Sequence, residues 1–262
     1  MTCHPHSRPQ VSQGVIQALG RIVAAALCLC LPLVAGAQSD GHGELAGEPL
    51  VDVAKVDPTI VIDLRYATPR NISGHPIYPP GTPCLLRRGA AEKLKSAQEL
   101  LRVLGYRLKI WDAYRPSRAQ QILWAIVQNP EVVADPATGG SRHSWGVAVD
   151  VTLVDPNGRD VPMPTDFDDF TAAAKSNYIG KDPVVAKNLL VLKTAMDIAG
   201  FEGVRDEWWH YSAKDWRSYG PVAAPAARLP VASPAPQASN KPALHMRAGT
   251  IPPPADATPT PQ

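Results

Sequence analysis

The chain has 262 residues, 45% of them hydrophobic, with 26 basic and 24 acidic side chains. A charge balance this close to neutral gives no electrostatic reason to expect a nucleic acid or an anionic surface as a partner. Outside the N-terminal region, no segment approaches the ~20 apolar residues of a membrane-spanning helix.

Residues 1–37 have the three parts of an export signal. Arg8 and Arg21 supply positive charge, residues 22–35 form an apolar run, and Ala35-Gly36-Ala37 offers small residues for cleavage. We therefore predict a signal peptide that is cleaved after Ala37, and an exported, periplasmic protein with no stable membrane insertion after cleavage. Because the apolar run is short, an uncleaved membrane anchor is the less favoured alternative.

The rest of the chain predicts one folded domain followed by a tail. Only Cys84 remains of the four cysteines once residues 1–37 are removed, so no internal disulfide is expected. From Pro221 onward the composition shifts to Ala, Pro, Ser and Thr, and this stretch holds eleven of the 28 prolines. Such a segment buries too little apolar area to offset the entropy of ordering. We predict a domain over 38–220 and a disordered tail over 221–262.

The first half of the domain contains strand and helix patterns. Residues 49–66 are rich in Val and Ile and are interrupted by Asp57-Pro58, which predicts one or two strands. Residues 71–83, rich in Pro and Gly, predict a loop. Apolar residues at helical spacing between 94 and 104 predict a helix that ends at Gly105.

The second half continues this mixture. Residues 106–111 alternate as a strand does, 117–128 predict a helix, and the apolar run 146–154 predicts a strand buried on both faces. Asp182-Pro183 is typical of a helix start, and an apolar stripe follows it to Gly200. A short strand is predicted over 208–211. Because strands and helices do not alternate regularly, we expect an α+β fold with helices packed on a small mixed or antiparallel sheet.

Two side chains that can bind metal flank the strand predicted over 146–154. His143 and Asp150 are seven positions apart and would point to opposite faces of a continuous strand. They can reach one site only if the chain turns between them, and Gly146 can provide that turn. An ionised Asp150 among buried apolar residues must be paired or bound to a cation, because it otherwise costs several kcal/mol.

A second cluster at 206–211 offers His210 with Glu207 three residues before it. With His143 and Asp150, His210 completes a set of two imidazoles and one carboxylate, which suits zinc and leaves the fourth position open, as in catalytic sites. Glu207 would then be the general base that takes a proton from the attacking water.

Plainer interpretations exist for each part of this set. A histidine beside a strand is often a hydrogen-bonded structural residue, and Asp150 could pair with Arg115. Trp208 and Trp209 could form a wall of the site or belong to the core. The prediction therefore depends on the full set rather than on one residue.

The motifs that carry this set resemble those of a known family. SRHSWGVAVD at 141–150 is similar to the S-x-H-x-x-G-x-A-[IV]-D signature of the zinc D-alanyl-D-alanine peptidases, and EWWH at 207–210 to their E-x-W-H motif. DLRYAT at 63–68, WDAYRP at 111–116 and MPTDFD at 163–168 look like the VanX-type dipeptidase branch. The matches span about residues 50–219. The resemblance implies a Hedgehog/DD-peptidase-like zinc site, with one zinc ion on His143, Asp150 and His210, and Glu207 as catalytic base.

The same resemblance implies roles for three further residues. Arg115 would stabilise the oxyanion, Ser141 would bind the substrate carboxylate, and Asp168 would bind the substrate ammonium group. The alternative for Arg115 is a structural pair with Asp112 or Asp150. Family members usually have glycine where Pro164 stands, so the loop that places Asp168 can differ here.

The candidate zinc site and the family resemblance together predict a zinc-dependent hydrolase, and the resemblance implies that it converts D-alanyl-D-alanine to free D-alanine. Its export favours recycling or catabolism of wall-derived dipeptide over destruction of a cytoplasmic precursor. Two alternatives remain open. The first is a zinc D,D-carboxypeptidase acting on peptidoglycan stem peptides, which needs an open site on the ammonium side. The second is a non-catalytic, zinc-stabilised binding module, which has no need of a base such as Glu207.

Overall fold

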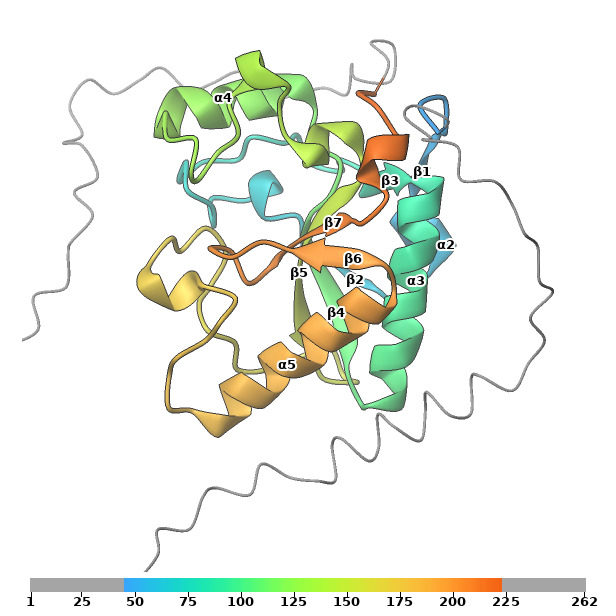
Figure 1. The fold of residues 1–262 in the computed structure, drawn as a ribbon, viewed down its shortest axis with the longest axis vertical. Coiled ribbons are helices and arrows are strands. Elements are labelled where there is room, and N and C mark those ends of the chain that lie inside the picture. Colours follow the sequence, from blue (N-terminus) through green and yellow to red (C-terminus); the bar gives the residue numbers. More distant parts are fainter. Residues whose placement is uncertain (1–44, 223–262) are drawn as a thin grey trace, which may run out of the picture. The chain divides into compact units, whose positions relative to one another are not determined.

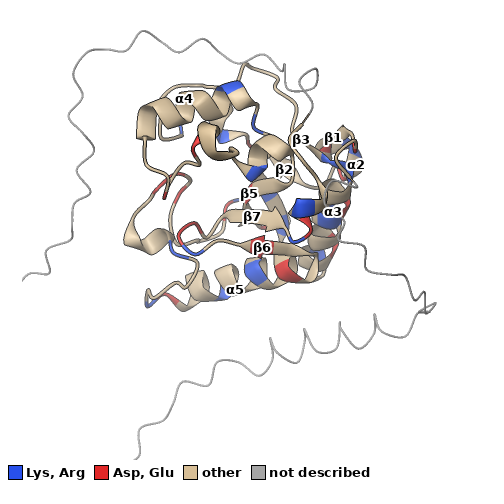
Figure 2. Cartoon of the chain, turned by 45° about the horizontal axis from the view of Figure 1, so that its top comes forward, with Lys and Arg blue, Asp and Glu red and all other residues tan. Residues whose placement is uncertain are grey.

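The computed structural model describes residues 45–222 of the chain. The predicted signal peptide over 1–37, and all but the first two residues of the predicted tail over 221–262, lie outside the described residues, so both stay predictions. Between residues 45 and 222, none of the helices combines the length and the apolar character needed to cross a membrane. Basic and acidic side chains are interspersed over the described elements (Figure 2).

A five-stranded mixed sheet forms the centre of the fold (Figure 1). In spatial order its strands are β2 (Val61–Ile62), β4 (Arg107–Asp112), β5 (Ala148–Val154), β7 (His210–Ala213) and β6 (Phe201–Gly203). β2 pairs with β4 in parallel, and the other three pairings are antiparallel. A separate antiparallel pair is formed by β1 (Leu50–Asp52) and β3 (Leu85–Arg87). The mixed sheet confirms the expected α+β class.

Four α-helices and five short 3-10 helices complete the described elements. The α-helices are α2 (Val53–Val56), α3 (Arg88–Val103), α4 (Ser117–Val127) and α5 (Pro183–Ile198). The 3-10 helices are η1 (Arg65–Ala67), η2 (Pro136–Thr138), η3 (Arg142–Trp145), η4 (Ala172–Ala174) and η5 (Trp216–Ser218). α3 and α5 pack against each other and against the central strands β4 and β5, which leaves the opposite side of the sheet to loops and to α4 (Figure 1).

The longest elements form where the sequence pattern predicts them. α3 buries a stripe that includes Leu94 and Leu101, and Gly105 follows its end with a φ of 79°, a conformation that glycine adopts readily. Asp182 caps α5 by accepting a hydrogen bond from the backbone N–H of Val184. All seven residues of β5 are buried, as a strand inside the sheet requires.

Several short elements differ from the prediction. Residues 49–66 contain two strands, but α2 lies between them, and η1 begins at the end of this stretch. The predicted strand over 208–211 is shifted to 210–213, and β3 and β6 were not predicted. Each of these strands has only two to four residues, too few to show alternation. Pairing with neighbours, rather than local periodicity, makes them strands.

Candidate metal centre and active site

The register of the sheet places three polar side chains in one row. Asp150 on β5 lies directly opposite His210 on β7 and, on its other side, opposite Asp112 on β4. Residues that face each other on neighbouring strands have side chains on the same face of the sheet, close enough to interact. The row therefore brings one predicted metal ligand beside another although sixty positions separate them in the chain.

His143 reaches this row from η3, which ends one turn before β5. Gly146 caps η3 with a φ of 74° and turns the chain between His143 and Asp150, as the sequence predicts. A side chain at position 146 would be strained, because a Cβ atom built there lies 2.6 Å from Leu50 Cδ2. The turn thus requires glycine because of its backbone conformation, and the crowding adds a smaller cost, since the end of the Leu50 side chain can shift.

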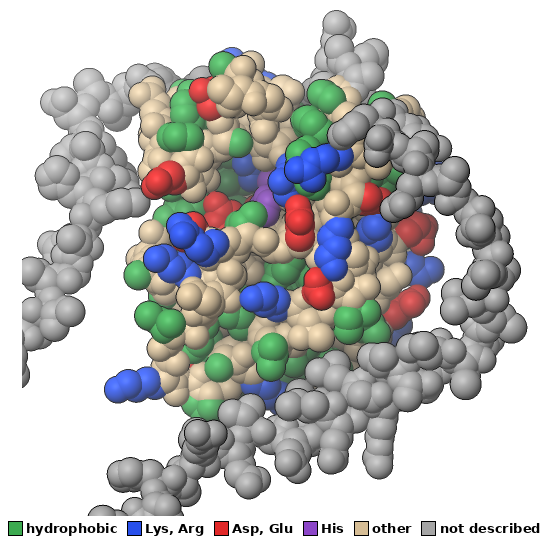
Figure 3. Space-filling model, in the orientation of Figure 1, with side chains coloured by type: hydrophobic (Ala, Val, Ile, Leu, Met, Phe, Trp, Pro, Cys, Tyr) green, Lys and Arg blue, Asp and Glu red, His purple; other side chains and the backbone are tan. Residues whose placement is uncertain are grey.

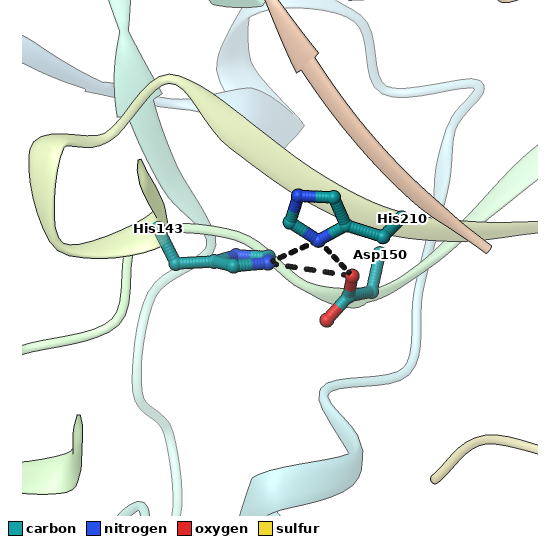
Figure 4. A group of neighbouring side chains, drawn as sticks. All are labelled: His143, Asp150 and His210. Carbon is teal, nitrogen blue, oxygen red and sulfur yellow. Dashed lines mark hydrogen bonds and ion pairs between the residues drawn. The ribbon is translucent and has the colours of Figure 1, made fainter. Parts of the chain in front are cut away.

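The three ligand atoms form a small triangle (Figure 4). His143 Nε2 lies 3.1 Å from His210 Nδ1 and 3.3 Å from Asp150 Oδ1, and the last two atoms are 3.1 Å apart. A tetrahedral zinc ion with bonds of about 2.0–2.1 Å separates its ligands by about 3.3 Å. Both the separations and the donor set of two imidazoles and one carboxylate fit zinc. Among residues 45–222, no other group of His, Cys, Asp and Glu has this geometry.

Neighbouring groups fix the direction of both imidazoles. His143 Nδ1 lies 2.8 Å from the carbonyl oxygen of Ala113, to which it can donate, and this leaves Nε2 free for the metal. His210 Nε2 lies 3.2 Å from Ser212 Oγ, which leaves Nδ1 free. Burial opposes ionisation of Asp150, but the adjacent imidazoles outweigh burial and hold its pKa below the usual range. All three ligand atoms are thus available to a cation.

Glu207 lies beside the triangle. Its Oε2 atom is 3.9 Å from His210 Nδ1, and its side chain is 19% exposed. Burial raises the pKa of the Glu207 carboxyl to about 7. A carboxyl group that ionises near neutral pH beside a metal-binding triangle is suited to act as a general base.

Arg115 is part of a buried network. Its Nε and Nη2 lie 2.9 Å and 2.8 Å from Asp112 Oδ2, Nη1 donates to Gln120 Oε1 at 2.9 Å, and Nη2 lies 3.6 Å from Asp150 Oδ2. Tyr78 donates to the other oxygen of Asp112 at 2.7 Å. The structural pairing of Arg115 named above as the alternative is therefore present. One of the two hydrogens on Arg115 Nη1 has no acceptor in this network.

Asp168 joins the site through Tyr66. The Asp168 carboxylate accepts hydrogen bonds from the backbone N–H of Ile72 at 3.0 Å and from the Tyr66 hydroxyl at 3.3 Å. The guanidinium of Arg115 lies 5.0 Å from the centre of the Tyr66 ring. Burial raises the pKa of Asp168 to about 7. Its φ is 57°, in the left-handed region, so the loop after Pro164 has an unusual backbone and still places Asp168 beside the site.

Ser141 begins η3. Its Oγ accepts the backbone N–H of His143 at 3.2 Å and keeps its own hydrogen available to another acceptor. The structure thus brings together all the residues that the sequence nominates. It adds Asp112, Tyr66 and Tyr78, to which sequence reasoning gave no role in the site. In the sequence, only their positions could have pointed to them: Tyr66 lies in the DLRYAT motif, Asp112 in the WDAYRP motif and Tyr78 in the loop over 71–83.

The two neighbouring tryptophans belong to the core. Trp208 and Trp209 are each 1% exposed and pack edge-on with Phe167 or Trp111. The interpretation that they are a pair in the core is therefore confirmed, and the interpretation that they form a wall of the site stays a prediction.

The site is open to solvent on one side. A surface cavity of about 480 Å³ reaches Glu207 and is lined by residues of the loop after α4, of the η4 region and of the loop before β7. In the space-filling view a histidine is visible at the bottom of a depression, with acidic and basic side chains around it (Figure 3). A small charged molecule can therefore approach the polar row from outside.

Comparison with known proteins identifies the family. The peptidase M15 model, described as D-ala-D-ala dipeptidase, matches residues 47–227. The D-alanyl-D-alanine dipeptidase of Escherichia coli (strain K12) is 37% identical over 170 residues, which cover 65% of this chain and 87% of that protein. The D-alanyl-D-alanine dipeptidase of Enterococcus faecium is 32% identical over 174 residues, covering 58% of this chain and 85% of that protein.

Among solved structures, VanYB in complex with D-Alanine-D-Alanine is similar at 18% identity and a TM-score of 0.33, over 58% of this chain and 79% of that one. A similarity this low carries no argument about the present site. The family assignment depends instead on the family model, which matches residues 47–227, and on the 37% identical dipeptidase of Escherichia coli, of which 87% is covered. The chain belongs to the peptidase M15 family of D-Ala-D-Ala dipeptidases and is a hydrolase of peptide bonds.

Proposed function

We propose that the chain is a zinc-dependent dipeptidase that hydrolyses D-alanyl-D-alanine to two molecules of free D-alanine. The observation that carries this proposal is the triangle of His143, Asp150 and His210 with the Glu207 carboxyl beside it. The family to which the chain belongs and the names of its relatives agree with the substrate.

The triangle would hold one zinc ion through His143 Nε2, Asp150 Oδ1 and His210 Nδ1. Zinc held by three protein ligands supplies Lewis acidity, which lowers the pKa of a coordinated water and polarises a carbonyl group. The hydrogen bonds from the second nitrogens of the two imidazoles would keep the ligand set in place.

Glu207 would move the proton in the reaction. As the water oxygen attacks the carbonyl carbon of the peptide bond, the Glu207 carboxylate takes a proton from that water. When the C–N bond breaks, Glu207 returns the proton to the leaving amine, so the carboxylate is regenerated. Arg115 would stabilise the negative charge that develops on the carbonyl oxygen, because its guanidinium lies beside the Asp150 carboxylate and its remaining Nη1 hydrogen can donate.

Two residues would recognise the charged ends of a free dipeptide. The Ser141 hydroxyl can donate to the substrate carboxylate, and the Asp168 carboxylate can accept from the substrate ammonium group. A buried charged terminus without a partner is costly, so Asp168 would favour a free dipeptide over a longer stem peptide. A D,D-carboxypeptidase would need that end of the site to be open.

We further propose that the enzyme is exported to the periplasm after cleavage behind Ala37, and that it recycles or consumes dipeptide released from the cell wall. The composition of residues 1–37 supports this proposal. Fractionation of expressing cells and N-terminal sequencing test it. We expect a periplasmic protein that begins at Gln38, and a cytoplasmic, unprocessed chain would contradict it.

The catalytic proposal is tested by measuring D-alanine released from D-alanyl-D-alanine and from its N-acetylated form, with zinc present. We expect cleavage of the free dipeptide only, and a loss of about 10²–10⁴-fold in kcat for Glu207→Gln. Asp206→Asn is the matched control, because Asp206 is the neighbouring carboxylate but is exposed and paired with Arg205.

Other outcomes select the alternatives. If the acetylated dipeptide is cleaved as well as the free one, the enzyme is a carboxypeptidase and the Asp168 anchor is refuted. If neither substrate is cleaved although zinc is bound, the chain is a zinc-stabilised binding module. If Glu207→Gln retains the wild-type rate, Glu207 is not the base.

A further inference from the structure

Arg87, the last residue of β3, is a buried cation that forms no ion pair with a carboxylate within residues 45–222. It is 4% exposed, and none of the ion pairs between described residues includes it. All its side-chain hydrogen bonds go to backbone carbonyl groups. Nε donates to Trp145 at 3.1 Å, Nη1 to Ala46 at 3.1 Å and to Glu48, and Nη2 to Gly220 at 3.1 Å and to Pro221 at 3.4 Å.

These contacts use the whole hydrogen-bonding capacity of the guanidinium group. Arginine has five side-chain N–H donors in a fixed plane, and each one has a carbonyl acceptor here. A buried charge is tolerated only when its donors are satisfied in this way. No other side chain offers five donors at these angles, so the position is specific for arginine.

The acceptors come from three segments that are far apart in the sequence. Ala46 and Glu48 lie at the start of the described domain, Gly220 and Pro221 at its end, and Trp145 is the last residue of η3. The backbone N–H of Arg87 also donates to the carbonyl of Gly146 at 2.8 Å. Arg87 therefore holds both ends of the domain and the turn after His143 together.

The same turn determines the position of His143. The carbonyl of His143 accepts from the backbone N–H groups of Arg115 at 3.1 Å and Gly146 at 2.9 Å. Displacement of Trp145 or Gly146 would therefore move His143, because Trp145, whose carbonyl Arg87 Nε contacts, lies only two positions after His143. Loss of a hydrogen-bond partner of a metal ligand typically lowers metal affinity by about 10- to 100-fold, and Arg87 acts one step further out, through the turn, so we expect the lower end of that range.

We propose that Arg87 is a positioning residue for the metal centre, which fixes the turn that carries His143 against the first and last residues of the domain. This inference rests on the proposed metal site. It assigns to the ends of the domain an influence on metal affinity, although neither end contributes a ligand.

The experiment measures zinc affinity of the metal-free full-length chain by competition with a chromophoric chelator, and the visible spectrum of the Co²⁺ form. Arg87→Met removes all donors, and Arg87→Lys keeps a cation with at most three. Arg107→Met is the matched control. Arg107 also donates to backbone carbonyls, those of Thr59 and Pro156, at the opposite end of β4 from Asp112. Circular dichroism confirms that each variant is folded.

We expect a zinc dissociation constant about 10-fold higher in Arg87→Met, an intermediate value in Arg87→Lys, an altered Co²⁺ spectrum, and a wild-type value in Arg107→Met. A purely structural role would lower stability and leave the affinity of the folded protein unchanged. A folded Arg87→Met variant with wild-type affinity and spectrum overturns the proposal. If Arg87→Met does not fold, a folded Arg87→Lys variant with wild-type zinc affinity and Co²⁺ spectrum overturns the proposal instead. A wild-type chain that binds no zinc refutes the metal site itself, which distinguishes the two failures.

Discussion

Replacement of Asp112 by asparagine removes the negative charge to which Arg115 is paired. Asp112 is fully buried and Arg115 is 7% exposed. The amide keeps the shape of the side chain and can still contact the Tyr78 hydroxyl, but it offers Arg115 one uncharged oxygen in place of a carboxylate. The variant therefore tests the charge of the pair rather than the space it occupies.

The expected loss follows from this burial. Removal of one partner from a buried ion pair costs about 3–5 kcal/mol, because the other charge stays in the interior. Here Gln120 at 2.9 Å and Asp150 at 3.6 Å remain as acceptors for Arg115. We therefore expect a loss near the lower limit, about 3 kcal/mol. We also expect weaker zinc binding, because Arg115 would compete with the metal for Asp150.

Urea unfolding of the metal-free protein measures the loss of stability. The double-mutant cycle compares Asp112→Asn, Arg115→Met and the variant that carries both changes. If the charges act as a pair, the double variant is no less stable than Asp112→Asn alone, with a coupling energy of roughly 1–3 kcal/mol. Asp197→Asn is the control, because its pair with Lys214 is exposed and should contribute at most about 1 kcal/mol. Additivity within about 0.5 kcal/mol would refute the reasoning.

Three further predictions concern the metal, the pH dependence and the turn. Zinc at 100 times its dissociation constant should raise the free energy of unfolding by about 2.7 kcal/mol, measured by urea unfolding with and without chelator, and His143→Ala should abolish this difference. A carboxyl group is uncharged below its pKa, so KM for the free dipeptide should rise as pH falls through about 7, where burial places the pKa of Asp168; a KM equally pH-dependent in Asp168→Asn would contradict the anchor role. Gly146→Ala should lower stability by about 1–3 kcal/mol and weaken zinc binding, because φ is 74° and the new Cβ meets Leu50; unchanged thermal unfolding and zinc titration would argue against a strained turn.

The sequence alone was enough to predict the class of the fold and to propose which residues form the site. His143, Asp150, His210 and Glu207 could be nominated because few side chains bind metal or move protons, and because their motifs have a characteristic spacing. α3, α5 and β5 could be predicted because each is long enough to show a period or a continuous apolar run.

The tertiary structure alone decided how those residues meet. The row of Asp112, Asp150 and His210 depends on the register of β4, β5 and β7, and register is set by contacts between strands rather than by any one strand. The placement of the tryptophan pair in the core has the same origin, because burial depends on which neighbours the fold supplies. Arg87 is the clearest case, because its five acceptors are backbone carbonyls from three distant segments. Every residue has a backbone carbonyl, so the amino-acid sequence cannot indicate which ones will accept from Arg87.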